Sequence, residues 1–383
     1  MVNTTRTWLQ NCTPQGHPKC FEAPYQTRTG EQRLLPNRLV DTGLLDENKP
    51  LVVPNMDILS MDNLPSVRVC TTDVLPQTSK YITLSHCWGG KPSLALNNDT
   101  IKQYCKEIPK SDLMSPGAKT FMHAIWVTRC LGFRFIWIDA LCIKQDDEDE
   151  KYQEISWMGS IYSNSMLNIS ATAAASGNDG LFYRRSLFRV MPCRKTMAAG
   201  QDPKKVVGEI IAYTARFQAE VDFGNANQRG WVFQERLLSP RVLHFSTDQI
   251  YWECPSLEAS ETLPSGDEKL RSAYSHTAKN WYLGSLETRM FDRNSTAWTF
   301  LAANFSRASF TNINDRLPAL SMVAKAYAQW ANLSPDTYMG GLWKSDIVRQ
   351  LSWHVVALWL SQKQAEYIGP SWSWSSVVSD GIL

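Results

Sequence analysis

Three short apolar segments alternate with two amphipathic ones, and this order constrains the fold of the 383-residue chain more than any other feature. Residues 81–86 (YITLSH), 133–139 (FRFIWID) and 166–172 (MLNISAT) are rich in apolar and β-branched side chains, as buried strands are. Residues 118–131 and 149–164 carry apolar side chains near helical spacing. The order predicts a parallel sheet in which the three strands are neighbours and both helices pack on it.

The composition of the sequence differs on the two sides of this core. Residues 1–66 are rich in Pro, Asn and Thr without periodicity, and we expect an irregular N-terminal arm there. Residues 67–260 are expected to form the main domain, with an α/β core at 67–182 and a β-rich part at 183–260. Residues 261–383 are expected to be a mixed helical, Trp-rich part packed on the core. The predicted fold class is α/β, with a parallel sheet core and an appended α+β, Trp-rich C-terminal half.

Charge and hydropathy exclude several classes of partner. The chain has 39 basic and 37 acidic residues, so its net charge of +2 gives no reason to expect nucleic acid or an anionic membrane as a partner. No apolar run reaches the roughly 20 residues that span a bilayer. The first thirty residues lack the basic and apolar layout of a signal peptide. We therefore expect a cytoplasmic protein.

The cysteine content also agrees with the expectation of a cytoplasmic protein. The nine cysteines form an odd set without a C-x-x-C pair. This pattern argues against a disulfide framework and against a zinc ribbon, so we expect free thiols and no metal site.

Polar side chains follow two of the predicted strands. Ligands of open parallel sheets bind outside the carboxyl ends of the strands, and the indole of Trp88 could stack on a flat ring there. A structural alternative stays open, in which the indole packs a strand end and Asp139 caps the following turn. The predicted ligand-binding residues of these strand ends are Ser85, His86, Trp88, Gly89, Asp139 and Gln145.

Glu154 is the candidate catalytic residue. It lies four residues before Met158 and seven before Ile161, so it shares the flank of the apolar stripe on its predicted helix. Partial desolvation favours the neutral form of a carboxyl group and suits acid–base or charge-stabilising chemistry. A satisfied structural acid is the alternative.

Two further residues lie around a short predicted helix at 229–240. Arg229 and Glu235 could close the ligand site from the second half of the domain, or they could pair with each other. Common catalytic motifs, including G-x-S-x-G, H-E-x-x-H and the P-loop, are absent from the sequence. Cys87 beside His86 is a poor catalytic pair, because adjacent strand residues point to opposite faces.

Together these segments resemble the fungal heterokaryon-incompatibility (HET) domain family. YITLSHCWGG (81–90) resembles its first block, residues 135–182 resemble its long second block, and RGWVFQERLLSPRVLHF (229–245) resembles its third. His86 stands where the family commonly has tyrosine, and Lys144 stands where it has asparagine or isoleucine.

The HET family is distantly similar to Toll/interleukin-receptor (TIR) domains, which have a flavodoxin-like α/β fold. Many TIR domains cleave NAD with a glutamate on a helix, and KYQEISWMGSIY (151–162) is similar to that helix at Glu154. The resemblance implies an NAD-cleaving, glycohydrolase-type enzyme in fungal self/non-self recognition and cell death. NAD would be its substrate, a nucleotide-like small molecule, and the resemblance implies no cofactor.

Two other hypotheses stay open. One is a non-catalytic signalling module that assembles into homo-oligomers, and the other is a fungal secondary-metabolite biosynthetic enzyme that uses the same pocket. The enzyme hypotheses require one cleft at the carboxyl edge of the sheet, lined by Ser85, Trp88, Asp139, Gln145 and Glu154.

Overall fold

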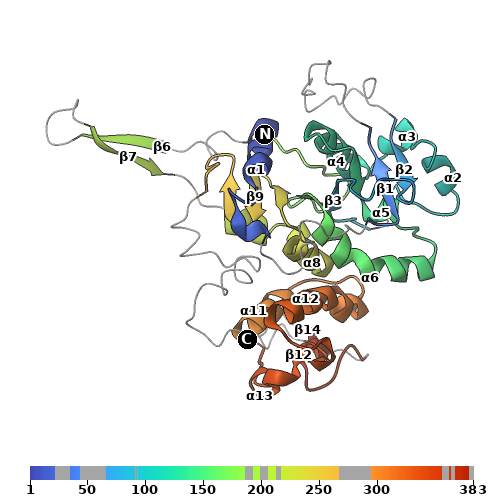
Figure 1. The fold of residues 1–383 in the computed structure, drawn as a ribbon, viewed down its shortest axis with the longest axis vertical. Coiled ribbons are helices and arrows are strands. Elements are labelled where there is room, and N and C mark those ends of the chain that lie inside the picture. Colours follow the sequence, from blue (N-terminus) through green and yellow to red (C-terminus); the bar gives the residue numbers. More distant parts are fainter. Residues whose placement is uncertain are drawn as a thin grey trace.

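The structure is a computed structural model that describes residues 1–21, 35–43, 66–90, 92, 94–185, 193–198, 206–212, 217–266, 295–355, 362–363 and 367–378. In these residues the largest sheet has eight strands in the order β10-β9-β8-β5-β3-β4-β1-β2 (Figure 1). Its strands are β1 (Arg38–Asp41), β2 (Arg68–Thr71), β3 (Tyr81–Ser85), β4 (Phe135–Trp137), β5 (Asn168–Ser170), β8 (Val242–Phe245), β9 (Ile250–Cys254) and β10 (Leu257–Ser260).

The centre of the sheet is parallel. β3 pairs in parallel with β4 on one side and with β5 on the other, and β5 pairs in parallel with β8. This confirms the prediction that the three apolar strands are neighbours in one parallel sheet, and the fold class is α/β. The first of these four strands in the chain, β3, lies between the second and the third. The strand order therefore reverses between β3 and β5, and such a switch point is where open α/β sheets bind ligands.

The two predicted helices are present as α4 (Lys119–Cys130) and α6 (Glu148–Asn164). α4 covers one face of the sheet, whereas α6 and α8 (Gly230–Leu238) cover the other (Figure 1). The Tyr81 hydroxyl of β3 donates to the Ile161 carbonyl of α6 at 2.7 Å. The acidic residues at the start of α6 suit the N-terminus of a helix, where negative charge complements the helix dipole. Asp147 is the N-cap, and its carboxylate accepts the Glu150 amide at 3.1 Å.

Antiparallel strands extend both sides of the parallel centre. β9 and β10 follow β8 as a meander, and β1 pairs with both β4 and β2. The N-terminal arm is therefore less irregular than its composition indicated, since it supplies the helix α1 (Val2–Asn11) and the strand β1 to the domain. β1 has four residues, and its strand conformation comes from pairing with neighbours rather than from local periodicity.

A second apolar core lies in the C-terminal part. Trp298, Trp343 and Trp374 are fully buried there, which supports the expectation of a Trp-rich C-terminal half. The helix α12 (Arg316–Ala331) packs against α8 and α6, so this core covers the helices that lie on the sheet (Figure 1). No helix among the described residues is both long enough and apolar enough to cross a membrane.

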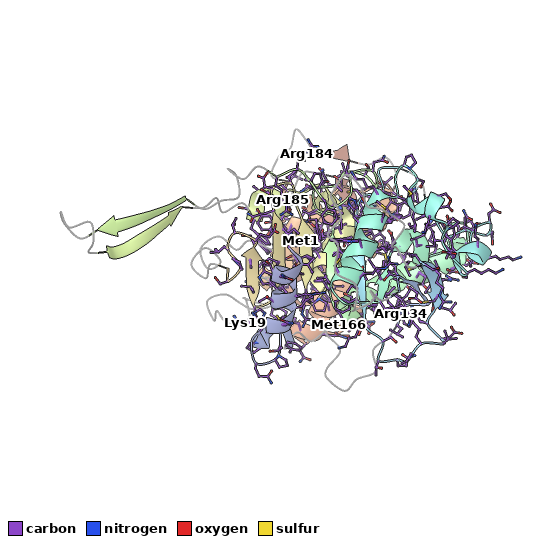
Figure 2. The ribbon with its side chains drawn as sticks, turned by 90° about the horizontal axis from the view of Figure 1, so that it is seen from above. Met1, Lys19, Arg134, Met166, Arg184 and Arg185 are labelled. Atoms are coloured by element: carbon purple, nitrogen blue, oxygen red, sulfur yellow. The ribbon has the colours of Figure 1, made fainter. Side chains whose placement is uncertain are left out.

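The remaining elements lie outside the large sheet or connect its strands. The hairpin of β6 (Cys193–Ala198) and β7 (Val206–Ala212) extends away from the sheet in both views (Figures 1 and 2). The other α-helices and strands of the described residues are α2 (Ile101–Tyr104), α3 (Lys110–Leu113), α5 (Asp139–Cys142), α11 (Ser295–Ser306), α13 (Ile347–Gln350), β11 (Tyr338–Met339), β12 (Leu342–Trp343), β13 (Gln362–Lys363) and β14 (Val377–Val378).

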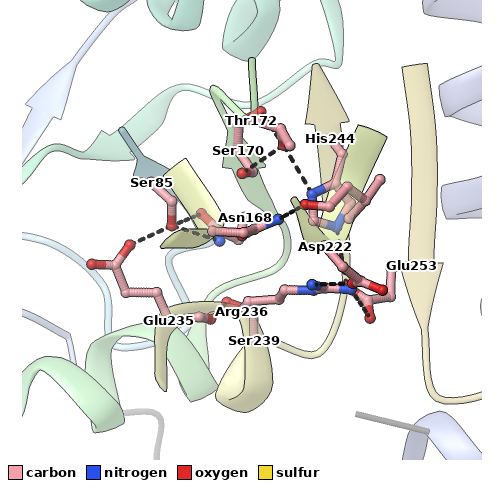
Figure 3. Close-up of polar contacts among 12 residues, drawn as sticks. Ser85, Asn168, Ser170, Thr172, Asp222, Glu235, Arg236, Ser239, His244 and Glu253 are labelled. Carbon is pink, nitrogen blue, oxygen red and sulfur yellow. Dashed lines mark hydrogen bonds and ion pairs between the residues drawn. The ribbon is translucent and has the colours of Figure 1, made fainter. Parts of the chain in front are cut away.

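A buried polar network fastens α8 to the sheet (Figure 3). Arg236 of α8 donates from Nε and Nη2 to the two carboxylate oxygens of Glu253 in β9, at 2.7 and 3.0 Å. Glu253 also accepts a hydrogen bond from His244 Nε2 at 3.0 Å, and the other ring nitrogen of His244 lies 3.0 Å from the Thr172 hydroxyl. Because these groups are desolvated, each depends on its partner.

Glu253→Gln should lower the free energy of unfolding by about 3 kcal/mol, because it removes a carboxylate that pairs with the largely buried Arg236 guanidinium. Urea denaturation measures the change. The control is Glu148→Gln, whose carboxylate is 84% exposed beside Lys151 and should matter by less than about 0.5 kcal/mol. A small and equal change in both variants would contradict an anchoring role for the network.

Candidate functional site

The carboxyl end of β3 carries a buried hydroxyl at the switch point. Ser85 Oγ donates to the carboxylate of Glu235 in α8 and accepts from Asn168 Nδ2 of β5 at 2.9 Å (Figure 3). All three side chains are buried. The contact joins two predicted site residues that are 150 positions apart in the sequence.

Burial decides the protonation of Glu235. Loss of solvent raises the pKa of this carboxyl to about 7, the nearby charge of Asp139 adds to the rise, and Arg229 and the hydroxyls of Ser85 and Tyr162 oppose it. A group with a pKa near neutrality can both accept and release a proton under physiological conditions. Glu235, predicted only as a binding residue, is therefore the strongest acid–base candidate of this cluster.

His86 follows Ser85 and points to the opposite face of the sheet. Its ring packs edge-on against Phe121 of α4 at 4.9 Å, and its Nδ1 lies 3.9 Å from Asp139 Oδ1. Its backbone carbonyl accepts a hydrogen bond from the Arg229 guanidinium. Burial lowers the pKa of His86, so the imidazole is neutral at physiological pH. Its Nε2 is buried without a partner among the described residues.

Asp139 and Trp88 form a pair at the same edge. Asp139 lies two residues after the end of β4 and begins α5, where its Oδ1 accepts the Ala140 amide at 2.7 Å. Its Oδ2 accepts the indole N–H of Trp88 at 3.0 Å. The Asp139 side chain remains 24% exposed, so solvent reaches this carboxylate.

Gln145 and Gly89 determine the backbone conformation near the cluster. The Gln145 amide donates to the carbonyls of Asp139 and Ile143 at 3.1 and 2.9 Å, so it holds the turn that carries Asp139. Gly89 has a φ of +67°, and a Cβ there would lie 2.4 Å from Cβ of Ser176. The glycine therefore allows close packing of two loops.

Glu154 lies apart from this cluster. It is 4% exposed, and its carboxylate accepts a hydrogen bond from Asn37, the residue before β1. Because β1 runs antiparallel to β4, Asn37 lies at the carboxyl edge of β4. Burial and the nearby Glu150 raise the pKa of Glu154, against the effects of Asn37 and Arg38.

The contacts thus unite six of the predicted residues around β3: Ser85, His86, Trp88, Asp139, Arg229 and Glu235. Among the described residues, none of the contacts of Glu154 reaches this group, so a single cleft containing Glu154 stays a prediction. Asn168 and Tyr162 were not predicted. A signal for Asn168 exists in the sequence, since it is an amide within the apolar run MLNISA.

The fold and the site define an α/β domain with a buried acid at its switch point. The family model described as Heterokaryon incompatibility protein (HET) matches residues 81–235, from the start of β3 to Glu235. The resemblance seen in the sequence is confirmed over residues 81–235, which match the HET family model. No curated protein and no solved structure gave a significant match.

The pH dependence of the free energy of unfolding should reveal the titration of Glu235. Its pKa is raised in the folded state, so the folded protein binds more protons than the unfolded chain between roughly pH 4.5 and 7. The Glu235 contribution to stability is therefore full at low pH and is lost as the pH rises through about 7. Glu235→Gln should remove this decline, which is on the order of 3 kcal/mol.

Urea denaturation at intervals from pH 5 to pH 8 measures the difference between the wild type and Glu235→Gln. The control variant is Glu107→Gln, at an exposed position, and its stability should follow the wild-type curve. Parallel curves for the wild type and Glu235→Gln would show that Glu235 does not titrate in this range.

Proposed function

We propose that the HET domain is an enzyme that hydrolyses the N-glycosidic bond of NAD at the carboxyl edge of its sheet. The observation that carries the proposal is the buried carboxyl of Glu235 at the switch point. It is hydrogen-bonded to Ser85 and has a pKa of about 7. The flavodoxin-like order of the parallel strands supports it as well, because TIR domains share that fold.

The reaction needs two things from the protein. When the bond between ribose C1′ and nicotinamide breaks, the electron pair leaves with nicotinamide and positive charge develops on the ribose, which a carboxylate stabilises. Water then forms the new bond to C1′ and gives its proton to a base, so the products are nicotinamide, ADP-ribose and a proton. A base is most effective when its pKa lies near the working pH, as that of Glu235 does.

The remaining residues have roles that fit the shape and charge of NAD. Glu154 would hold the ribose hydroxyls and stabilise the cationic ribose, as the TIR resemblance implies. Trp88, held by Asp139, would stack on a ring of the dinucleotide. Arg229 would attract the diphosphate, because a guanidinium pairs well with phosphate oxygens. In this proposal the activity serves fungal self/non-self recognition and cell death in the cytoplasm.

Purified full-length protein should release nicotinamide from NAD, measured by chromatography of the reaction mixture. Glu235→Gln should reduce turnover roughly 100-fold and abolish the rise in rate as the pH increases through about 7. Glu107→Gln should retain wild-type turnover. Wild-type protein that binds NAD without releasing nicotinamide would refute the hydrolase and favour a signalling module whose oligomeric state changes with ligand.

Glu154→Gln separates the roles of the two glutamates. If Glu154 stabilises the cationic ribose, turnover falls roughly 100-fold while the pH profile keeps its shape, because Glu235 still acts as the base. The wild-type fold and affinity for NAD should be kept, which calorimetry measures. A variant that melts several degrees lower and retains turnover would make Glu154 a structural acid.

A further inference from the structure

Four side chains with metal-binding chemistry meet on the β9 side of the sheet, outside the HET match. Cys12, His17, Cys20 and Cys254 each place one ligand atom within 4.8 Å of all the others. The Cys254 sulfur lies 3.5 Å from His17 Nδ1. The three cysteines are buried and free of disulfide bonds, and His17 is half-buried.

The local structure explains how distant residues come together. Cys12 is the C-cap of α1, the His17 amide donates to the Thr13 carbonyl at 2.7 Å, and the Cys20 amide donates to the His17 carbonyl at 3.0 Å. These turns direct three ligands of the N-terminal segment towards Cys254, the last residue of β9. Figure 2 shows this segment, marked by Met1 and Lys19, beside the yellow strands of the sheet.

The distances suit a tetrahedral ion. With Zn–S bonds of about 2.3 Å and Zn–N bonds of about 2.0 Å, tetrahedral ligands are separated by about 3.5 Å for sulfur and nitrogen and about 3.8 Å for two sulfurs. The separation of Cys254 and His17 already matches, and the widest separation of 4.8 Å needs to close by roughly 1 Å. Thiolates with one imidazole form a ligand set typical of structural zinc.

The surroundings balance the charge of such a site. Three thiolates, a neutral imidazole and Zn²⁺ together carry one negative charge. The buried Arg241 guanidinium donates from Nε to the Cys12 sulfur at 3.0 Å and from Nη2 to the Cys12 carbonyl at 3.1 Å. Its positive charge offsets that of the site, and hydrogen bonds of this kind orient metal ligands. The Cys20 thiol has a further partner in the Ser256 hydroxyl at 3.5 Å.

We propose that Cys12, His17, Cys20 and Cys254 bind one zinc ion that fastens the N-terminal helix to the end of β9. Four protein ligands leave no open position for substrate, so the site is structural rather than catalytic. The sequence expectation of no metal site rested on the absence of a C-x-x-C pair. That criterion misses these ligands, because they are spaced C-x4-H-x2-C and the fourth lies on a distant strand.

The test uses full-length protein purified without chelators and measures its zinc by mass spectrometry. We expect one zinc per chain in the wild type and a loss of zinc in Cys12→Ser and Cys254→Ser. Cys105→Ser, outside the cluster and half-exposed, and Cys130→Ser, outside the cluster and buried, should retain the metal. Zinc retained in both ligand variants, or wild-type protein that stays zinc-free after zinc loading, would overturn the proposal.

A second measurement does not depend on whether the variants fold. Replacing zinc with cobalt(II) in the wild type should give the intense visible absorption of tetrahedral cobalt with thiolate ligands. Removing the metal with a chelator should lower the melting temperature by on the order of 5 °C, because a metal that binds only the folded state stabilises it. A disulfide between two of the cysteines, or an iron–sulfur chromophore, would overturn the zinc assignment. None of these readouts involves NAD, so they are independent of the proposed catalytic activity.

Discussion

The hydrogen bond between Ser85 and Glu235 organises the segment that matches the HET family model. It joins the end of β3, where the parallel strand order reverses, to α8 at the far end of the family match. Because both groups are buried, losing either partner would leave the other without solvent to replace it. The neighbouring residue, Arg236, fixes α8 through Glu253, so the helix cannot slide without breaking an ion pair. The match thus begins on the strand and ends on the helix that this contact brings together.

Two adjacent residues of α8 show how the surroundings of a buried ionisable group set its charge state. Burial acts to lower the pKa of the Arg236 guanidinium, but pairing with the carboxylates of Glu253 and Asp222 outweighs this and raises the pKa, so Arg236 remains an ion. Among the described residues Glu235 receives hydrogen bonds but has no direct salt bridge, so burial dominates and its pKa rises to about 7. Arg236 therefore anchors the helix, whereas the adjacent Glu235 can exchange a proton.

Local periodicity predicted the elements that carry the parallel centre, because buried strands and amphipathic helices have patterns readable within some ten residues. It could not predict β1, a strand of four residues whose conformation depends on pairing with β4. It named the residues at the strand ends but not their roles. Gln145 binds backbone carbonyls, and the pKa of Glu235 depends on Ser85, which is remote in sequence.

Arg241 connects the cysteine cluster with the switch point. Its guanidinium bonds to the Cys12 sulfur and carbonyl, while its own backbone carbonyl accepts the amide of Asn168 at 2.9 Å. Asn168 in turn donates to Ser85, the partner of Glu235. With zinc bound as proposed, α1 would hold the guanidinium at the start of β8 and thereby keep β8 in register with β5. The N-terminal segment then contributes to the site indirectly, because it fixes β8, the strand that pairs with β5, and the side-chain amide of Asn168 in β5 orients the Ser85 hydroxyl.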